Sequence, residues 1–252
     1  MALRGVGANP LSGRGKVAGR EVLPWDEPDL NRPERVIAFC EDLPITAGKL
    51  AGKPMRLRDW QREFIRAVYT EDEAGRRPVR TAVLSMGRKN GKTQLAAALA
   101  LCHLLGPEAE PRGEVYSCAL TRDQAAKLFA EMVAILDAHD ELADRCNVIR
   151  FTKQIEVLSG HGAGSMYVAL SADAGSKLGL SPSFVVYDEL GSAPNRALFD
   201  AMDTASGARD NPLMMVISTQ AAADHAVMSE LVDYGLRVQS GDVADPSFHL
   251  TL

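Results

Sequence analysis

The segment Ser85-Met86-Gly87-Arg88-Lys89-Asn90-Gly91-Lys92-Thr93 decides the fold, because it joins two segments of different character. Residues 79–85 include an apolar run typical of a buried strand, and residues 91–105 have the composition of a helix. Glycine in such a loop lets the backbone approach an anion, and the loop amides and helix N-terminus direct partial positive charge toward it. The segment therefore predicts a phosphate-binding loop between a strand and a helix.

Two residues at the end of this loop carry the expected chemistry. Lys92 would reach the β- and γ-phosphates of a nucleotide, and the Thr93 hydroxyl would hold Mg²⁺. The usual pattern has a glycine where Met86 stands, whereas this chain has Gly87 one residue later. A basic turn with a capped helix is the alternative, but the strand–loop–helix context favours a phosphate site. The nucleotide-binding residues expected in the loop are Gly87, Arg88, Lys89, Asn90, Gly91, Lys92 and Thr93.

An acidic pair follows a second apolar strand, Phe184 to Tyr187. Asp188 and Glu189 would lie at the carboxyl edge of a parallel sheet, where ligands of such sheets bind. We expect Asp188 to hold Mg²⁺ and Glu189 to orient and activate a water for attack on the γ-phosphate. A helix that begins with two acids for dipole reasons is the alternative. The combination with the phosphate loop favours a nucleotide hydrolase.

A third apolar strand, Met214 to Ile217, ends in three hydrogen-bonding side chains, Ser218, Thr219 and Gln220. Such a strand would lie beside the other two, so its tip could touch the γ-phosphate or the attacking water. A strand end followed by a helix cap explains the same residues equally well.

Upstream, the segment Leu57-Arg58-Asp59-Trp60-Gln61 offers groups suited to a base. The Gln61 amide has the donor and acceptor needed for an adenine edge, and a ring such as that of Trp60 can stack on the base. The alternative, a Trp60 that anchors a helix to the core, is the stronger interpretation from these residues alone. We expect Asp59 to cap this helix.

Strands alternate with helices along most of the chain, and the strands are apolar throughout. This pattern favours a mostly parallel α/β sheet with helices on both faces. We expect an irregular N-terminal arm over residues 1–30 that becomes ordered near Trp25. The expected strands cover residues 79–85, 114–120, 148–158, 165–170, 183–187 and 213–218, and the expected helices begin near Asn31, Asp59, Gly91, Thr121, Arg196 and Ala222.

Charge is distributed unevenly over the 252 residues, although the net charge is −5. Residues 53–92 hold eleven basic and five acidic groups, whereas residues 93–252 hold ten basic and twenty-one acidic groups. A protein with one basic sector can meet a polyanion on that side alone, although solvated faces without a partner would give the same counts. With 46% hydrophobic residues the chain is expected to fold as a globular domain, and no apolar run is long enough for a membrane span.

Taken in order, these motifs resemble the ATPase domain of the large terminase subunit of tailed bacteriophages. The resemblance covers about residues 32–245 and implies a P-loop NTPase fold of the ASCE, or RecA-like, class. Residues 246–252 would then begin a linker to a nuclease domain. The segments that carry the resemblance are Arg88-Lys-Asn-Gly-Lys-Thr93, residues 46–52 running into 57–61, residues 121–125, residues 179–182 and residues 218–220.

The resemblance also implies a role for each matching residue. Lys92, Arg88 and Glu189 are implied to be catalytic, with Arg88 sensing or stabilising the γ-phosphate in cis. Family members also receive a basic finger from a neighbouring subunit, for which this chain offers Lys177, Arg196 and Arg209 as candidates. The remaining implied roles are Thr93 and Asp188 for Mg²⁺, Gln61 for adenine, and Ser218, Thr219 and Gln220 for coupling hydrolysis to movement.

The function implied is an ATP- and Mg²⁺-dependent motor that drives double-stranded DNA into a procapsid in the cytoplasm of the infected bacterial host. The implied partners are DNA, the portal protein, the small terminase subunit and copies of this chain in a ring, for which a pentamer is expected, with a monomer as the alternative for the isolated chain. No membrane partner is expected. Since the sequence stops at Leu252, nuclease activity is not expected.

Three other functions remain open from the residues. A helicase-like ATPase acting on nucleic acid suits the same motifs but needs a second RecA-like domain. A metal nuclease using Asp188, Glu189, Asp200 and Asp203 leaves the Gly-Lys-Thr loop unexplained. A non-catalytic nucleotide-binding or ring-assembly module would bind ATP without turnover.

Overall fold

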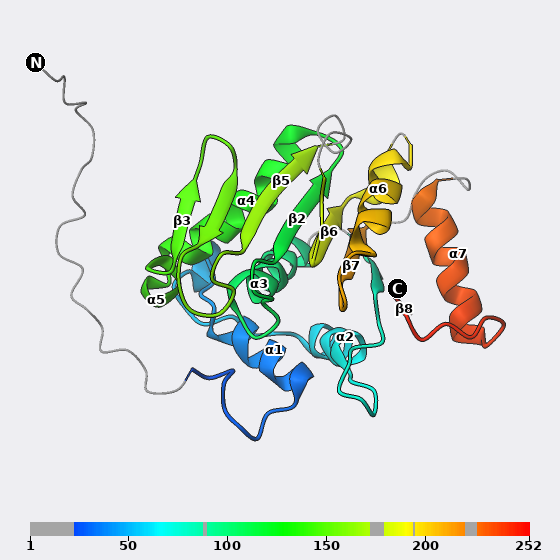
Figure 1. The fold of residues 1–252 in the computed structure, drawn as a ribbon, viewed down its shortest axis with the longest axis horizontal. Coiled ribbons are helices and arrows are strands. Elements are labelled where there is room, and N and C mark those ends of the chain that lie inside the picture. The colour runs from blue at the N-terminus through cyan, green and yellow to red at the C-terminus, as the bar shows by residue number, and fades with distance from the viewer. Residues whose placement is uncertain (1–22, 88–89, 172–178, 194, 220–225) are drawn as a thin grey trace, which may run out of the picture.

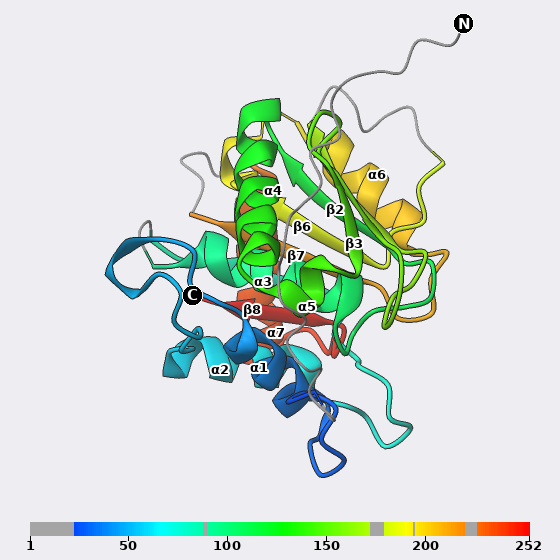
Figure 2. The ribbon, with the colours of Figure 1, turned by 90° about the vertical axis from the view of Figure 1, so that its left-hand side faces the viewer.

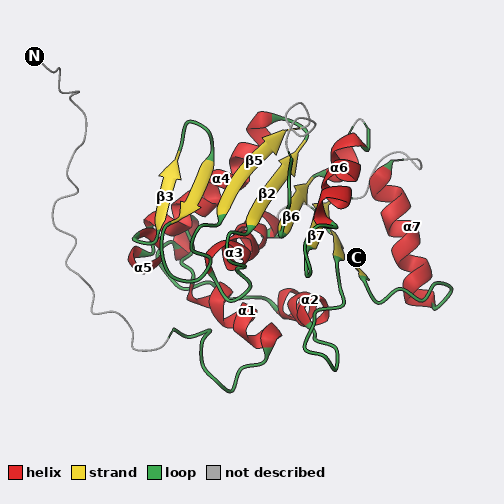
Figure 3. Ribbon diagram, in the orientation of Figure 1, coloured by secondary structure: helices red, strands yellow, loops and turns green. Residues whose placement is uncertain are grey.

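The computed structural model describes residues 23–87, 90–171, 179–193, 195–219 and 226–252, and these form an eight-stranded sheet flanked by helices (Figure 1). Figure 3 distinguishes the central strands from the surrounding helices. The strands are β1 (Thr81–Ser85), β2 (Glu114–Ala119), β3 (Cys146–Ile149), β4 (Gln154–Val157), β5 (Met166–Ser171), β6 (Phe184–Asp188), β7 (Leu213–Ser218) and β8 (Phe248–Thr251). The helices are α1 (Arg32–Asp42), α2 (Asp59–Tyr69), α3 (Lys92–Leu105), α4 (Arg122–Asp137), α5 (Asp140–Ala143), α6 (Ala197–Ser206) and α7 (Val227–Ser240), with short 3₁₀ turns η1 (Gly48–Leu50) and η3 (Leu190–Ser192).

The strand order is β3-β4-β5-β2-β6-β7-β1-β8. Neighbouring strands in the part of this order that runs β5-β2-β6-β7-β1-β8 are parallel, whereas β3 and β4 add an antiparallel meander at one edge. The expected mostly parallel sheet is therefore confirmed. Because β7 lies between β1 and β6, the phosphate-loop strand and the acidic strand end at the same edge, one strand apart.

Apolar residues on both faces of the sheet hold the helices in place. Successive strand residues point to opposite faces, so Ala82 and Leu84 of β1 join one core while Val83 joins the other. The first core includes side chains of α1, α2, α3 and α4, and the second includes side chains of α6 and α7. Figure 2 shows α4 and α6 on opposite sides of the strands. The prediction of helices on both faces is confirmed.

Helix α3 is buried almost all round, because it packs against the sheet and is covered by α1 and α4. Its residues Leu95–Leu105 are all buried, which explains why it lacks the polar stripe of a surface helix. The helix that follows the phosphate loop is thus a rigid central element. No helix in the described ranges is long and apolar enough to cross a membrane.

Three of the sequence predictions differ from the observed elements. The single strand expected over residues 148–158 is two strands, β3 and β4, which pair antiparallel because the chain turns at residues 150–153. Arg58, not Asp59, occupies the N-cap of α2, and the Gln61 side-chain oxygen accepts a 2.8 Å hydrogen bond from the Arg58 amide. Residues 246–252, expected to begin a linker, contain β8, which pairs in parallel with β1. The sheet therefore continues past the boundary that we placed at residue 245.

The described part of the expected N-terminal arm is packed against the domain. Trp25 is fully buried, and its ring meets that of Phe39 edge-on with 4.8 Å between centroids. Trp25, near which we expected the chain to become ordered, thus belongs to the first core. The predicted helix start at Ala222 lies outside them, and α7 begins at Val227 in the described part.

Candidate active site

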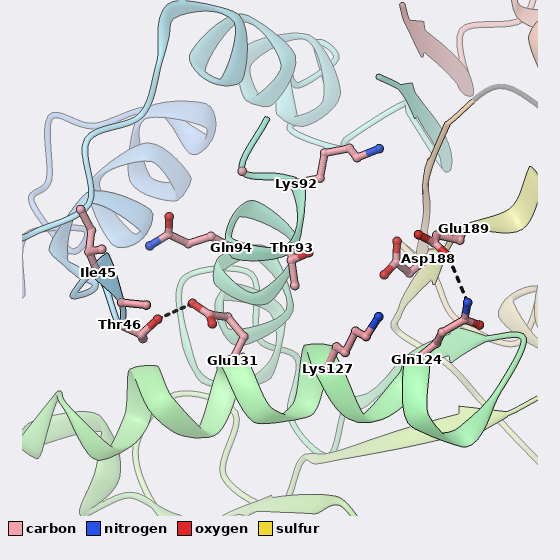
Figure 4. A pocket seen from close by; sticks show the side chains of 12 residues that line it. Ile45, Thr46, Lys92, Thr93, Gln94, Gln124, Lys127, Glu131, Asp188 and Glu189 are labelled. Carbon is pink, nitrogen blue, oxygen red and sulfur yellow. Dashed lines mark hydrogen bonds between the residues drawn. The ribbon is translucent and has the colours of Figure 1, made fainter. Parts of the chain in front are cut away.

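A pocket of about 400 Å³ lies at the carboxyl edge of the parallel strands (Figure 4). The start of α3 forms one wall, the end of β6 another, and one face of α4 a third, while a loop before η1 closes the fourth side. The lining residues are Ile45, Thr46, Ala47, Gly91, Lys92, Thr93, Gln94, Gln124, Lys127, Glu131, Asp188 and Glu189.

The end of the phosphate loop has the backbone geometry of an anion site. Gly91 is the N-cap of α3 and has φ of 75°, in the left-handed region where a Cβ atom is strained. The first-turn amides of a helix lack intrahelical acceptors and carry the positive end of its dipole. Lys92 and Thr93 form this first turn. The structure brings Gly91, Lys92 and Thr93 together at this pocket.

The Lys92 ammonium donates a 2.6 Å hydrogen bond to the Met86 carbonyl. Reaching a bound β- or γ-phosphate requires the side chain to leave this carbonyl. Asn90 makes a weaker contact of 3.3 Å from its amide nitrogen to the Gly87 carbonyl, so the loop is also bridged at its base. Arg88 and Lys89 lie outside the described residues, and their predicted roles stay predictions.

The acidic pair faces α3 across the pocket, as Figure 4 shows. Burial, reinforced by the neighbouring charge of Glu189, raises the pKa of Asp188, while Lys92 and Lys127 act in the opposite sense. Glu189 has φ of 56° and ψ of 41°, so the chain turns sharply where β6 ends. Its amide donates a 2.9 Å hydrogen bond to the Ile217 carbonyl of β7, which anchors that turn.

The donor set fits a magnesium ion. Hydroxyl and carboxylate oxygens are the ligands that Mg²⁺ prefers, and it commonly uses one or two carboxylates together with substrate phosphates. Thr93 and Asp188 line the same pocket from opposite walls, where burial and the Glu189 charge disfavour the ionised form of Asp188 and raise its pKa. A bound divalent cation would favour the ionised form.

One face of α4 contributes groups that our sequence analysis did not assign to the site. Gln124, Lys127 and Glu131 are spaced three and four residues apart, which places them on one side of the helix. Gln124 donates a 3.0 Å hydrogen bond from its amide nitrogen to Glu189, and Glu131 accepts one of 2.7 Å from the Thr46 hydroxyl. Figure 4 shows the Lys127 side chain directed toward the acidic pair. The sequence signal for these site residues was a polar stripe along α4, but a solvated helix face produces the same stripe.

The tip of β7 connects the phosphate-loop strand to the acidic turn. Ser218 is buried and pairs with Ser85 of β1, and its hydroxyl accepts a 3.0 Å hydrogen bond from the Gly191 amide. The same hydroxyl donates to the Thr219 carbonyl at 2.6 Å. Ser218 and Thr219 are not among the residues that line the pocket, and their predicted coupling role stays a prediction. Gln220 lies outside the described residues.

A second pocket, of about 420 Å³, adjoins the first and shares Ile45, Gly91 and Gln94 with it. Gln61 lines this pocket, and its amide oxygen is occupied by the N-cap of α2, so the amide nitrogen is the group left for a ligand. Trp60 instead packs against the first core and does not line either pocket. This packing favours the interpretation of Trp60 as an anchor for α2, because the ring lies against apolar side chains, and its contact with a nucleotide stays a prediction.

The finger candidates lie in different surroundings. Arg196 is exposed at the start of α6 and pairs with Asp200 and Glu230. The guanidinium of Arg209 donates to the Ser181 and Arg112 carbonyls and to Glu110, near the amino ends of β2 and β6. These contacts join the segment that carries Arg209 to the segments that precede β2 and β6. Lys177 lies outside the described residues.

A phosphate loop followed by a buried helix, and an acidic strand separated from the loop strand by one other strand, define a P-loop ATPase domain of the RecA-like class. The comparisons with known proteins narrow this class. The model of the terminase large subunit ATPase domain matches residues 59–237. This chain therefore belongs to the family of terminase large subunit ATPase domains.

Similar proteins agree with this assignment. The large terminase subunit of Enterobacteria phage HK97 is 42% identical over 207 residues, which cover 81% of this chain and 40% of that protein. The crystal structure of the HK97 large terminase gives a TM-score of 0.76 at 38% identity, covering 88% of this chain and 44% of that one. The large terminase of a thermophilic bacteriophage, solved in complex with ADP, shares the fold with a TM-score of 0.56 at 10% identity, over 77% of this chain and 45% of that one. This chain thus spans less than half the length of these relatives.

Proposed function

We propose that this chain is the ATP-hydrolysing motor domain of a phage terminase large subunit, which drives double-stranded DNA into a procapsid. The observation that carries the proposal is the convergence of Lys92, Thr93, Asp188 and Glu189 on one pocket at the edge of the sheet. The family assignment supports packaging over the helicase-like alternative.

The two adjoining pockets suggest how a nucleotide lies. The phosphates would occupy the first pocket, against the first turn of α3, where backbone amides favour anions. The base would extend into the second pocket, past Gly91 and toward the Gln61 amide nitrogen. The basic residues Lys53, Arg56 and Arg58 line this second pocket. Part of the positive charge of residues 53–92 would therefore face nucleotide, not DNA.

The chemistry follows from the acidic pair. Thr93 and Asp188 would hold Mg²⁺, which neutralises phosphate charge when bound. Glu189 would orient a water in line with the γ-phosphate and accept its proton. Once released from the Met86 carbonyl, Lys92 would stabilise the charge that develops on the transferred phosphoryl oxygens, because a cation in a partly buried pocket is less screened than one in bulk water.

The partners are proposals of the same kind. DNA would be held through its phosphates without base readout, since packaging accepts any sequence, so binding should weaken steeply with salt. A ring of copies, together with the portal protein and the small terminase subunit, would complete the motor in the cytoplasm of the infected host. A cation from a neighbouring copy would approach the γ-phosphate. Of the described candidates, Arg196 is the one whose exposed side chain could reach the site of a neighbouring copy.

The test is Mg²⁺-dependent ATP turnover by the chain and by Lys92→Ala and Glu189→Gln. Both variants should lose at least a hundredfold in kcat, because each removes a group that acts in the transition state. Glu156→Gln is the matched control, since Glu156 lies on the distant β4 and bonds the exposed Asn147. Wild-type turnover in either site variant would contradict the assignment. Binding of ATP without turnover by the wild-type chain would favour the non-catalytic module.

A further inference from the structure

The Glu189 carboxylate is held by a side chain from another element. Gln124, in the first turn of α4, donates a 3.0 Å hydrogen bond from its amide nitrogen to one Glu189 oxygen, Oε2. The contact spans the pocket between the end of β6 and the helix that follows β2 (Figure 4). It therefore links the expected base to an element outside the phosphate loop.

A capping box fixes which end of the Gln124 amide faces Glu189. The amide oxygen accepts a hydrogen bond from the Thr121 backbone amide at 3.2 Å, and the Thr121 hydroxyl accepts one from the Gln124 backbone amide at 3.2 Å. A backbone N–H can be met only by the oxygen, so the NH₂ group is the end that remains for the carboxylate. The start of α4 thus preorganises a donor toward the pocket.

The geometry suits a carboxylate that must accept a proton from water. A glutamate side chain has several rotatable bonds, and losing that freedom is costly unless contacts fix it. The Gln124 bond occupies Oε2 and leaves Oε1 to accept a hydrogen bond from a water. The left-handed turn at Glu189 fixes the backbone, and the Gln124 bond fixes the far end of the side chain.

We propose that Gln124 is a positioning residue for ATP hydrolysis, which holds Glu189 in the orientation that aligns the attacking water. The proposal rests on the proposed function, since it gives Glu189 the role of base. It differs from a structural role of the cap, because the cap uses the amide oxygen and the Thr121 hydroxyl, whereas the catalytic effect uses the amide nitrogen.

The experiment separates these two uses of the side chain. Gln124→Glu keeps a capping-box residue at the third helical position but replaces the donor by a second carboxylate. Its kcat should fall at least tenfold, because hydrogen bonds to charged groups are worth about a tenfold factor or more, while KM for ATP stays within about twofold. Thr121→Ala is the matched control: it should lower the melting temperature and leave kcat near the wild-type value.

A second set of variants tests whether Gln124 acts through Glu189. In a Glu189→Gln background, Gln124→Glu should cause no further loss of turnover, since the group being positioned is already replaced. Independent, multiplicative losses would overturn the proposal. An increase in kcat for Gln124→Glu or Gln124→Leu would also overturn it, because the bond would then be restraining the base and not orienting it.

Failure of the proposed function has a different outcome. A wild-type chain that binds ATP and never hydrolyses it would contradict the ATPase proposal. The contact itself is then tested by melting temperatures of Gln124→Leu, Glu189→Leu and the double variant. Non-additive shifts in melting temperature support the Gln124–Glu189 contact, and additive shifts overturn it whatever the activity.

Discussion

The Thr46 hydroxyl donates a 2.7 Å hydrogen bond to Glu131, so the loop before η1 is joined directly to α4 at the first pocket. Thr46 lies before the phosphate loop in sequence, and Glu131 lies after it. The bond closes the side of the pocket opposite the acidic pair, as Figure 4 shows. Two sides of the pocket are therefore formed by the loop before η1 and by α4, and a bond between these two segments, not the phosphate loop, keeps them together.

Replacing Thr46 by valine should weaken nucleotide binding and leave the chemical step largely intact. The variant loses about 1 kcal/mol of hydrogen bonding, equivalent to roughly a fivefold rise in KM for ATP. Steady-state kinetics measure both parameters. Thr70→Val is the control, because the Thr70 hydroxyl bonds the carbonyl of Arg66 in its own helix on an exposed surface. A KM unchanged in Thr46→Val would show that the cross-pocket bond does not shape the nucleotide site.

Replacing Gly91 by alanine should damage both stability and binding. Its φ of 75° costs an L-residue about 1–2 kcal/mol, and relief of that strain would move the first turn of α3. We expect a lower melting temperature and about tenfold weaker binding of a fluorescent ATP analogue. Gly179→Ala is the matched control, since an added Cβ at Gly179 meets nothing within 4 Å. Equal effects of the two substitutions would argue against a special backbone at Gly91.

Replacing Ser218 by alanine should destabilise the turn that carries Glu189. The variant leaves the partly buried Gly191 amide without its acceptor, at a cost of about 1–3 kcal/mol. Chemical denaturation measures this loss. Ser206→Ala removes another buried hydroxyl, but that hydroxyl donates to a carbonyl of its own helix, so we expect a smaller change. A Ser218→Ala variant as stable as the control would contradict the bridging role of the hydroxyl.

Replacing Asp188 by asparagine should stabilise the nucleotide-free protein at neutral pH. Burial and the Glu189 charge raise the pKa of Asp188, so its ionised form is less favourable in the folded state than in the unfolded one. That penalty applies above the raised pKa and disappears as the pH falls toward the ordinary value of 3.8. Melting temperatures of both proteins over this pH range, without Mg²⁺, measure the difference. A gain that stayed constant with pH would have another cause.

The sequence was sufficient to predict the part of the site that lies at strand ends. Residues 91–93 and 188–189 each follow an apolar strand, and a parallel sheet brings such ends to one edge. The order of strands does not follow from the motifs, because pairing is a tertiary choice. Trp60 could serve a base or a core, and the sequence favoured the core, against which the ring packs in the structure.

The remaining features depend on contacts between distant segments. Gln124, Lys127 and Glu131 have the spacing of a solvated helix face, and they become site residues only because α4 lies along the pocket. Strand β8 has only four residues, and it is a strand because it pairs with β1. No local sequence pattern predicts this pairing. The cap of α2 moved by one residue because the Gln61 side chain reaches back to the Arg58 amide.

The position of β8 has a mechanical consequence. It runs parallel to β1, so its last residues lie at the same edge as the phosphate loop. A force applied at Thr251 along the strand axis would load the hydrogen bonds between β8 and β1 together, in shear, and would not peel them apart one by one. Tension applied there would reach the strand that supports Gly91 and Lys92 with little slack. A force at Thr251 would thus be transmitted to a nucleotide at the phosphate loop through the single pair of strands β8 and β1.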